Sequence, residues 1–211
     1  MLTDKETGQQ IIQIVHELFA MGLLTATGGN ISAAAEEPGT FWITPSQIYK
    51  GGLHESDLVR IQTDGRVVEG TRTPSVEYRM HARCYAVRDD ISAAVHTHAP
   101  VATAFGICNQ SFPPINTEAV VLADTVTVPW FMPGSQELAD AVGEALRVRR
   151  GCILQNHGLM TVGPSLRQAA TRALMLEETA KIVLYTKQFG GAVTLLPDDW
   201  ISRLAAAAEF I

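Results

Sequence analysis

The stretch Ile91-Ser92-Ala93-Ala94-Val95-His96-Thr97-His98-Ala99-Pro100 joins an apolar run to two histidines. The apolar residues predict a buried strand, and side chains two positions apart on a strand point to the same face. His96 and His98 should therefore aim both imidazoles at one point, near the carboxyl end of an interior strand. Neutral imidazole is the commonest metal ligand in proteins. The pair alone fits either a metal site or two ordinary hydrogen-bonded histidines.

Two further residues can join this pair. Glu77 lies upstream, and His157 lies downstream in Gln155-Asn156-His157-Gly158, at the end of another predicted interior strand. Three histidines and one carboxylate would form an open, Lewis-acidic metal site, of the kind that zinc occupies. Two buried imidazoles without partners would each cost roughly 1–3 kcal/mol, which a metal ion removes. The plainer interpretation of Glu77 is a carboxylate that favours the dipole of a helix in its first turn.

Composition limits the classes of function. The 211 residues fit one domain spanning 1–211, and the 46% apolar and 18% charged residues are typical of a compact protein. The net charge is −6 and there is no basic run, so no nucleic-acid partner is expected. The polar start and the shortness of every apolar run predict neither a signal peptide nor a membrane span.

The three cysteines bear on the compartment. Cys84, Cys108 and Cys152 are odd in number, widely spaced and without a Cys-x-x-Cys motif. They are predicted to be buried, small apolar side chains in a reducing compartment rather than ligands or a disulfide framework. A cytoplasmic location is therefore expected.

Periodicity and capping residues predict the elements. Helices are expected from the Thr3-Asp4-Lys5-Glu6 capping box to Gly22, from behind Ser75 (76–87), after Pro100, from Ser135 to 148, from Ser165 to about 187, and in an alanine-rich docking tail after 191. Strands are expected at 41–44, 58–62, 67–68, 91–98, 120–122, 125–128, 152–155 and 159–162. Strands and helices do not alternate strictly and hairpins are present. We therefore expect an α/β fold, a single three-layer α/β/α domain with a central, mostly antiparallel sheet.

Other polar residues have both a functional and a plain interpretation. The loop Thr27-Gly28-Gly29-Asn30 offers backbone N–H groups that can hold an anion, although such a sequence is commonly an ordinary turn. Ser46 and Ser75 are hydroxyls near turn prolines, where capping is the plain interpretation. Glu118 precedes an apolar stretch, and its spacing alone favours a surface position.

Five motifs carry a family resemblance. They are Thr27-Gly28-Gly29-Asn30-Ile31-Ser32, Ile43-Thr44-Pro45-Ser46, Thr73-Pro74-Ser75-Val76-Glu77, His96-Thr97-His98 and Gln155-Asn156-His157-Gly158. In this order they resemble the class II aldolase and adducin-head family, and within it most of all the fuculose-phosphate aldolases. The similarity extends from the first helix to about residue 189.

The resemblance implies a role for each matching position. His96, His98 and His157 match the family's zinc ligands, with Mn²⁺, Fe²⁺ or Co²⁺ as possible replacements. Glu77 matches the carboxylate that completes the resting zinc shell and serves as acid and base. The phosphate-binding loops correspond to Gly29 and Asn30, to Ser46, and to Ser75. The family further implies a homotetramer with active sites between subunits.

Three positions depart from the fuculose-phosphate aldolase pattern. Gln47 stands where that pattern has glycine, and Val76 stands where it has a second serine, which removes one phosphate donor. The expected tyrosine acid appears as Thr117. Glu118, next to it, matches a catalytic glutamate of other family members, and this alignment favours a catalytic role over a surface one.

The expected function is a zinc-dependent lyase. The leading form is an aldolase that cleaves a ketose 1-phosphate, fuculose-phosphate-like, to dihydroxyacetone phosphate and an aldehyde through a metal-stabilised enediolate. The three departures support an alternative, a decarboxylase, dehydratase or epimerase acting on a hydroxy acid or sugar acid. A non-catalytic interaction module, as in the adducin head, is the third possibility, although such a module has no need of four ligands.

Overall fold

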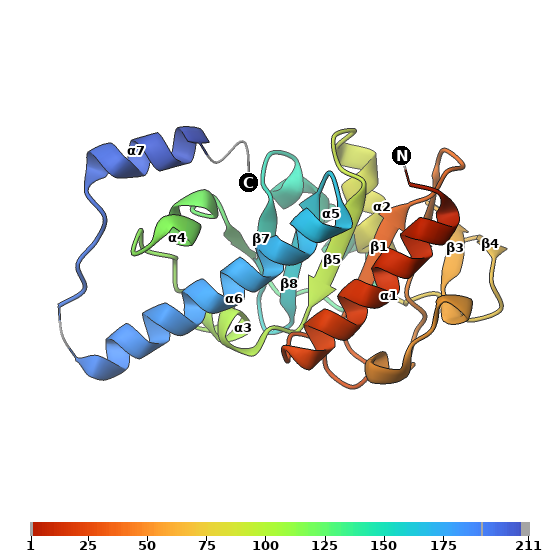
Figure 1. The fold of residues 1–211 in the computed structure, drawn as a ribbon, viewed down its shortest axis with the longest axis horizontal. Helices are drawn as coiled ribbons and strands as arrows, with labels where there is room; N and C mark the ends of the chain where they lie inside the picture. Colours follow the sequence, from red (N-terminus) through yellow and green to blue (C-terminus); the bar gives the residue numbers. More distant parts are fainter. Residues whose placement is uncertain (1, 191, 208–211) are drawn as a thin grey trace.

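An eight-stranded sheet forms the centre of the computed structural model, which describes residues 2–190 and 192–207 (Figure 1). The strand order is β4-β3-β2-β1-β5-β8-β7-β6. Every neighbouring pair is antiparallel except β6 and β7, which confirms the expectation of a mostly antiparallel sheet. The strands are β1 Asn30–Ala34, β2 Thr40–Ile43, β3 Val59–Gln62, β4 Val67–Glu69, β5 Ala93–Thr97, β6 Val126–Val128, β7 Gly151–Leu154 and β8 Gly158–Gly163.

Helices cover both faces of the sheet, which gives the expected three layers. They are α1 Asp4–Ala20, α2 Tyr78–Val87, α3 Pro100–Ile107, α4 Thr117–Val121, α5 Gln136–Leu146, α6 Leu166–Phe189 and α7 Asp198–Ala207, with short 3₁₀ turns η1 Lys50–Gly52 and η2 Glu55–Asp57. Figure 1 shows α1 and α6 in front of the sheet. The predicted capping box of Thr3 and Glu6 begins α1, and Ser135 and Ser165 cap α5 and α6 as expected.

Strand β5 links the two layers of the core. Ala93 and Val95 pack in the cluster that contains residues of α1, α3 and α6, while Ala94 packs in the cluster that contains residues of α2 and α5. Since side chains alternate along a strand, His96 lies on the same face as Ala94, toward α2. Thr97 ends the strand, and His98 follows it.

A buried carboxylate fixes the chain just beyond these histidines. Glu177 of α6 is 1% exposed and accepts hydrogen bonds from the backbone N–H groups of Val101 and Ala102, in the first turn of α3. A negative charge at a helix amino terminus is stabilising. The segment from His98 into α3 is therefore anchored to the long helix behind it.

Some sequence predictions are wrong. Residues 120–122 were expected to form a strand, but they form the end of helix α4 and its C-cap. Asn116 is the N-cap of this helix, and its side chain accepts a hydrogen bond from the Ala119 N–H. Helix α2 starts at Tyr78, so Glu77 is its N-cap rather than a residue of its first turn. Cys84 and Cys152 are buried as expected, but Cys108 is exposed.

The tail forms the expected helix, α7, which packs against α4. None of the described residues of α7 is buried, so its docking contributes little to the core. Of the described helices, none combines the length and the apolar character that crossing a membrane requires.

Gly158 provides a test of how closely β5 and β8 approach at the histidines. A Cβ atom on Gly158 would collide with the Thr97 carbonyl oxygen and lie 3.2 Å from the His96 Cε1 atom. Gly158→Ala should therefore lower the free energy of unfolding by about 1–3 kcal/mol, because the paired backbones must separate. Urea unfolding measures this change. Gly8→Ala in α1 is the control, since its Cβ would make an ordinary 3.6 Å contact and should be neutral or stabilising. Equal effects of the two changes would contradict the close approach.

Candidate metal centre

The structure brings together Glu77, His96, His98 and His157. One ligand atom from each lies within 4.8 Å of the ligand atoms of the other three. The residues come from three places in the fold: the N-cap of α2, the end of β5, and the turn between β7 and β8. The three imidazole rings lie at centroid distances of 4.8–5.4 Å from one another. Glu77 and His96 are buried, and the other two are partly exposed, so the cluster is open on one side.

Hydrogen bonding orients the ring of His96. Its Nδ1 atom lies 2.7 Å from the Leu159 carbonyl oxygen, which can only accept, so Nδ1 carries the proton. In the neutral ring the Nε2 lone pair then faces the cluster. That atom lies 3.2 Å from His98 Nε2 and 3.4 Å from Glu77 Oε2. Such a carbonyl contact is the usual support of a metal-binding histidine.

The arrangement of donor atoms fits a divalent cation. Two imidazole nitrogens face each other across 3.2 Å, which favours a positive species between them. Glu77 Oε1 lies 3.1 Å from His157 Nε2, yet it is buried without an aligned hydrogen bond. Three imidazole nitrogens and one carboxylate are a donor set that divalent transition metals accept. The cluster could therefore hold a metal ion.

Electrostatics keep the carboxylate ionised. Burial alone would raise the pKa of Glu77, but the adjacent His96 and His157 outweigh it and hold that pKa well below its ordinary range. Burial, with His96 and His157 nearby, lowers the pKa of His98 to about 4. A ligand set needs a charged carboxylate and neutral imidazoles, and these shifts favour that state for Glu77 and His98.

A buried polar chain supports Glu77 from behind. Asn30 Nδ2 donates to Glu77 Oε2 over 2.8 Å, and Asn30 Oδ1 lies 2.6 Å from His81 Nε2. His81 Nδ1 in turn lies 2.7 Å from the Ser32 hydroxyl, which lies 2.7 Å from the Tyr85 hydroxyl. Asn30 pairs with His96 across β1 and β5, so both face α2. Burial lowers the pKa of His81 to about 3, which keeps its ring neutral.

Asn30→Ala should impair both stability and catalysis. The change removes the hydrogen bond that orients Glu77 and leaves the fully buried His81 Nε2 without its partner. We expect a loss of about 1–3 kcal/mol in the free energy of unfolding and a drop of about ten- to a hundredfold in kcat/KM. In urea unfolding, a double change with His81→Ala should cost less than the sum of the single changes. Strict additivity would show that Asn30 and His81 do not act together.

The glycine loop lies directly against the cluster. A Cβ atom on Gly28 would come within 2.6 Å of the His98 Nδ1 atom, and one on Gly29 within 3.1 Å of the His96 carbonyl oxygen. Gly29 also has a φ of +81°, which glycine adopts without strain. Both side-chain ends of Asn30 bond within the protein, so its part in phosphate binding, like that of Gly29, stays a prediction.

The other two predicted loops meet beside the first. Pro45 and Pro74 form an isolated antiparallel bridge, and the Ser46 N–H donates to the Thr73 carbonyl oxygen. The Ser75 hydroxyl accepts a 3.3 Å hydrogen bond from the Glu77 N–H two residues later, in the turn before α2. The N-cap of α2 is Glu77, so the predicted capping of this helix by Ser75 is wrong. Gln47 has a φ of +57°, in the left-handed region that glycine adopts without strain. The phosphate-binding roles of Ser46 and Ser75 stay predictions.

Glu118 does not belong to the cluster of four. It is exposed in the first turn of α4. Its predicted catalytic role is therefore untested by the geometry of this chain. The sequence interpretation missed His81, although a spacing of four from Glu77 would place both residues on one side of a helix.

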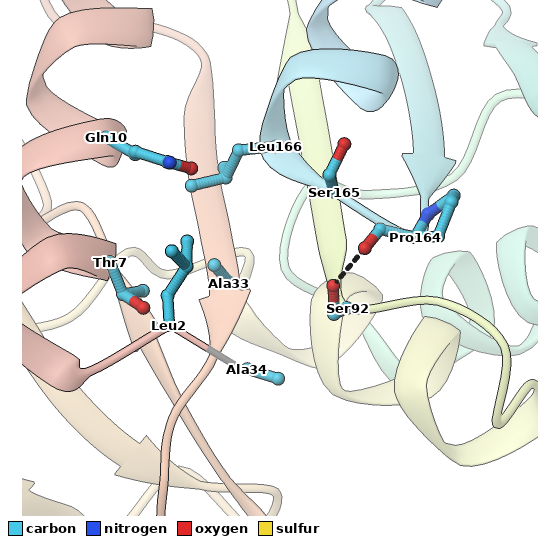
Figure 2. Close-up of a pocket in the computed structure, with 9 residues that line it drawn as sticks. All are labelled: Leu2, Thr7, Gln10, Ala33, Ala34, Ser92, Pro164, Ser165 and Leu166. Atoms are coloured by element: carbon cyan, nitrogen blue, oxygen red, sulfur yellow. Dashed lines mark hydrogen bonds between the residues drawn. The ribbon is translucent and has the colours of Figure 1, made fainter.

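A cavity elsewhere lacks the chemistry of the cluster. It has a volume of about 330 Å³ and lies at the opposite end of β5, where the Ser92 hydroxyl donates to the Pro164 carbonyl oxygen over 2.6 Å (Figure 2). Its lining contains no ionisable side chain and comprises Leu2, Thr7, Gln10, Ala33, Ala34, Ser92, Pro164, Ser165 and Leu166. This cavity therefore offers no acid, base or metal ligand for a reaction.

Known proteins similar to this chain include several aldolases. The model of the Class II Aldolase and Adducin N-terminal domain matches residues 9–184. The 5-deoxy-D-ribulose 1-phosphate aldolase of Bacillus thuringiensis serovar kurstaki is 35% identical, over 99% of this chain and 98% of its own. The L-fuculose phosphate aldolase of Escherichia coli K12 is 34% identical, over 92% and 90%. A solved L-fuculose 1-phosphate aldolase structure superposes with a TM-score of 0.88 at 33% identity, covering 97% of both chains.

These matches cover nearly the whole chain. Class II aldolases use a divalent metal, and the cluster of Glu77 with three histidines is where one could bind. The chain belongs to the class II aldolase and adducin N-terminal domain family and is a lyase of that family.

Proposed function

We propose that this protein is a zinc-dependent aldolase that cleaves a ketose 1-phosphate to dihydroxyacetone phosphate and an aldehyde. The observation that carries the proposal is the convergence of Glu77, His96, His98 and His157 within 4.8 Å. Three imidazoles with one carboxylate favour zinc over the harder cations Mg²⁺ and Ca²⁺. The relatives named for 5-deoxyribulose 1-phosphate and fuculose phosphate support substrates of this class.

In aldol cleavage of a ketose 1-phosphate, the hydroxyl on C4 loses a proton and the neighbouring carbon C3 gains one. The hydroxyl at C4 loses its proton, the C3–C4 electron pair stays on C3, and C3 gains a proton, which yields dihydroxyacetone phosphate and an aldehyde. A divalent cation, when bound, supplies the positive charge that stabilises electron density on the substrate oxygens. Glu77 delivers the proton at C3, and its hydrogen bond from Asn30 orients the carboxylate for that task. Glu118 serves as the group that handles the hydroxyl proton.

The substrate's phosphate is assigned to the three loops beside the cluster, with Gly29, Asn30, Ser46 and Ser75 as its partners. Gly28 of the glycine loop lies directly against the ring of His98. This position supports a bound phosphate that lies close to the metal ligands. We further propose a cytoplasmic homotetramer in which a neighbouring subunit completes each site. Glu118 and the described residues of α7 are not buried within this chain, which supports the proposal that a neighbouring subunit covers them.

The test is release of dihydroxyacetone phosphate from purified protein supplied with zinc. 5-Deoxyribulose 1-phosphate and fuculose 1-phosphate are offered, and dihydroxyacetone phosphate is measured by its coupled reduction with NADH. Activity should disappear on chelation and return with zinc. Absence of the product from both sugars and from other common ketose 1-phosphates would reject the aldolase.

A decarboxylase or dehydratase on the same scaffold is the second candidate. The observation that favours it is Val76, a 60% exposed apolar side chain beside Glu77, where a phosphate donor is expected. A substrate with a carboxylate in place of a phosphate would not need that donor. Carbon dioxide evolution or dehydration of hydroxy acids and sugar acids, with no cleavage of ketose 1-phosphates, would establish this candidate instead.

A further inference from the structure

Lys50 is the one lysine in the described residues whose side chain is fully buried. It is 1% exposed, at the start of η1. Its ammonium makes a single hydrogen bond, 3.4 Å long, to the Pro45 carbonyl oxygen. An ammonium has three donors, and a buried charge is costly unless it is paired. Burial lowers the pKa of Lys50 to about 8, against the opposing effect of Glu77. This lysine is therefore buried without a matching anion of its own.

The position of Lys50 joins the three predicted phosphate loops. Its backbone N–H donates to the Ala26 carbonyl oxygen over 2.8 Å, which ties η1 to the glycine loop. Its ammonium touches Pro45 of the second loop, and Pro45 is bridged to Pro74 of the third. The charge also interacts with Glu77, His96 and His98. Lys50 thus lies at the junction between the loops and the cluster.

Glu77 does not serve as a dedicated partner for this charge. Its oxygens already lie against His96, His157 and the Asn30 amide. Among the described residues Lys50 makes no direct ion pair. A structural role would require one well-formed set of hydrogen bonds, whereas the single long contact to Pro45 leaves two donors of the ammonium unused. The buried charge is better explained by an anion that arrives with the substrate.

We infer that Lys50 binds the phosphate group of the substrate, and that it supplies at the three-loop junction the charge that compensates for the missing donor at Val76. The inference rests on the proposed function for the identity of the substrate. It assigns Lys50 as a binding residue, and it assigns the site a preference for a phosphate dianion over a carboxylate. A compact ammonium is a strong point partner for phosphate oxygens.

The experiment measures binding of inorganic phosphate and of acetate to the metal-free full chain by isothermal titration calorimetry. The variant is Lys50→Met, because methionine is unbranched, has a similar length and fits irregular buried space. Lys50→Met should weaken phosphate binding about ten- to a hundredfold. The exposed Lys5→Met removes the same charge from the surface of α1 and should change nothing. Unchanged phosphate affinity in Lys50→Met, or no phosphate binding by the wild type, would overturn the inference.

Steady-state kinetics separate this inference from the proposed function. In the zinc-loaded enzyme, Lys50→Met should raise KM for dihydroxyacetone phosphate in the condensation direction by a similar factor, with a smaller effect on kcat. A wild type that cleaves ketose 1-phosphates, with a Lys50→Met variant of unchanged KM, would refute the role of Lys50 and keep the aldolase. A wild type without lyase activity, in which phosphate binding still depends on Lys50, would refute the aldolase and keep the phosphate site. If Lys50→Met does not fold by circular dichroism, Lys50→Gln replaces it in both measurements.

Discussion

His96→Ala is expected to abolish metal binding, with less than about a tenth of a zinc ion retained per chain and a loss of at least about a thousandfold in cleavage rate. His96 is fully buried and contacts the other members of the cluster, with its Nε2 atom 3.2 Å from His98 Nε2 and 3.4 Å from Glu77 Oε2. Its removal takes away one of three imidazoles and leaves the Leu159 carbonyl without its donor. Elemental analysis after dialysis against a zinc buffer, together with the coupled assay, measures both losses.

His16→Ala is the matched control for this change. His16 lies exposed on α1 and makes no contact with the cluster, so its removal should leave metal content and rate unchanged. Circular dichroism and thermal unfolding of metal-free protein establish that His96→Ala still folds. A folded His96→Ala variant that keeps one zinc per chain at wild-type affinity would contradict the assignment of His96 as a ligand.

The fold could be predicted where the signal is local. The apolar run Ala93-Ala94-Val95 predicted a buried strand, and the structure buries it. The helix caps at Thr3, Ser135 and Ser165 follow from side-chain oxygens that accept backbone N–H groups. Each of these depends on neighbours within a few residues. The mostly antiparallel sheet followed from hairpins and from the lack of strict alternation.

Helix α4 shows where the local signal fails. A short apolar run does not distinguish a strand from a buried helical segment, and residues 120–122 were assigned to a strand on that basis. Asn116 is the decisive residue, because its side chain accepts from the Ala119 N–H and begins a helix. The prediction that Cys108 is buried fails for a different reason. Cys108 is the C-cap of α3, where burial depends on which elements pack there rather than on residue type.

The candidate site could be predicted only in part. The four clustered residues stand in motifs that can be recognised in the sequence, and the structure gathers them. The support behind them depends on long-range pairing: Asn30 meets Glu77 and His81 because β1 pairs with β5 and because α2 packs on that face. The burial of Lys50 could not be predicted for the same reason. Nothing in the local sequence indicates that its ammonium is buried against Pro45.

Glu77→Gln is expected to separate catalysis from metal binding. Glutamine has the shape of glutamate, so the side chain still fits beside Asn30, but it cannot carry a proton between substrate atoms. We expect a loss of about a hundred- to ten-thousandfold in kcat. Metal content should fall much less, because three imidazoles remain. The coupled assay and elemental analysis of the same sample measure both quantities.

The matched control is Glu144→Gln, which removes a carboxylate that is 73% exposed on α5 and should leave rate and metal content unchanged.

The loss of rate compared with the loss of metal content in Glu77→Gln decides the role of Glu77. If metal content and rate fall together by the same factor, and excess zinc restores the rate, Glu77 acts as a ligand alone. If the rate stays low at full zinc occupancy, Glu77 moves the proton. The strongly lowered pKa of Glu77 belongs to its place between His96 and His157, and a carboxylate that leaves such neighbours becomes more basic. A zinc-saturated Glu77→Gln enzyme with the wild-type rate would therefore contradict the acid–base role.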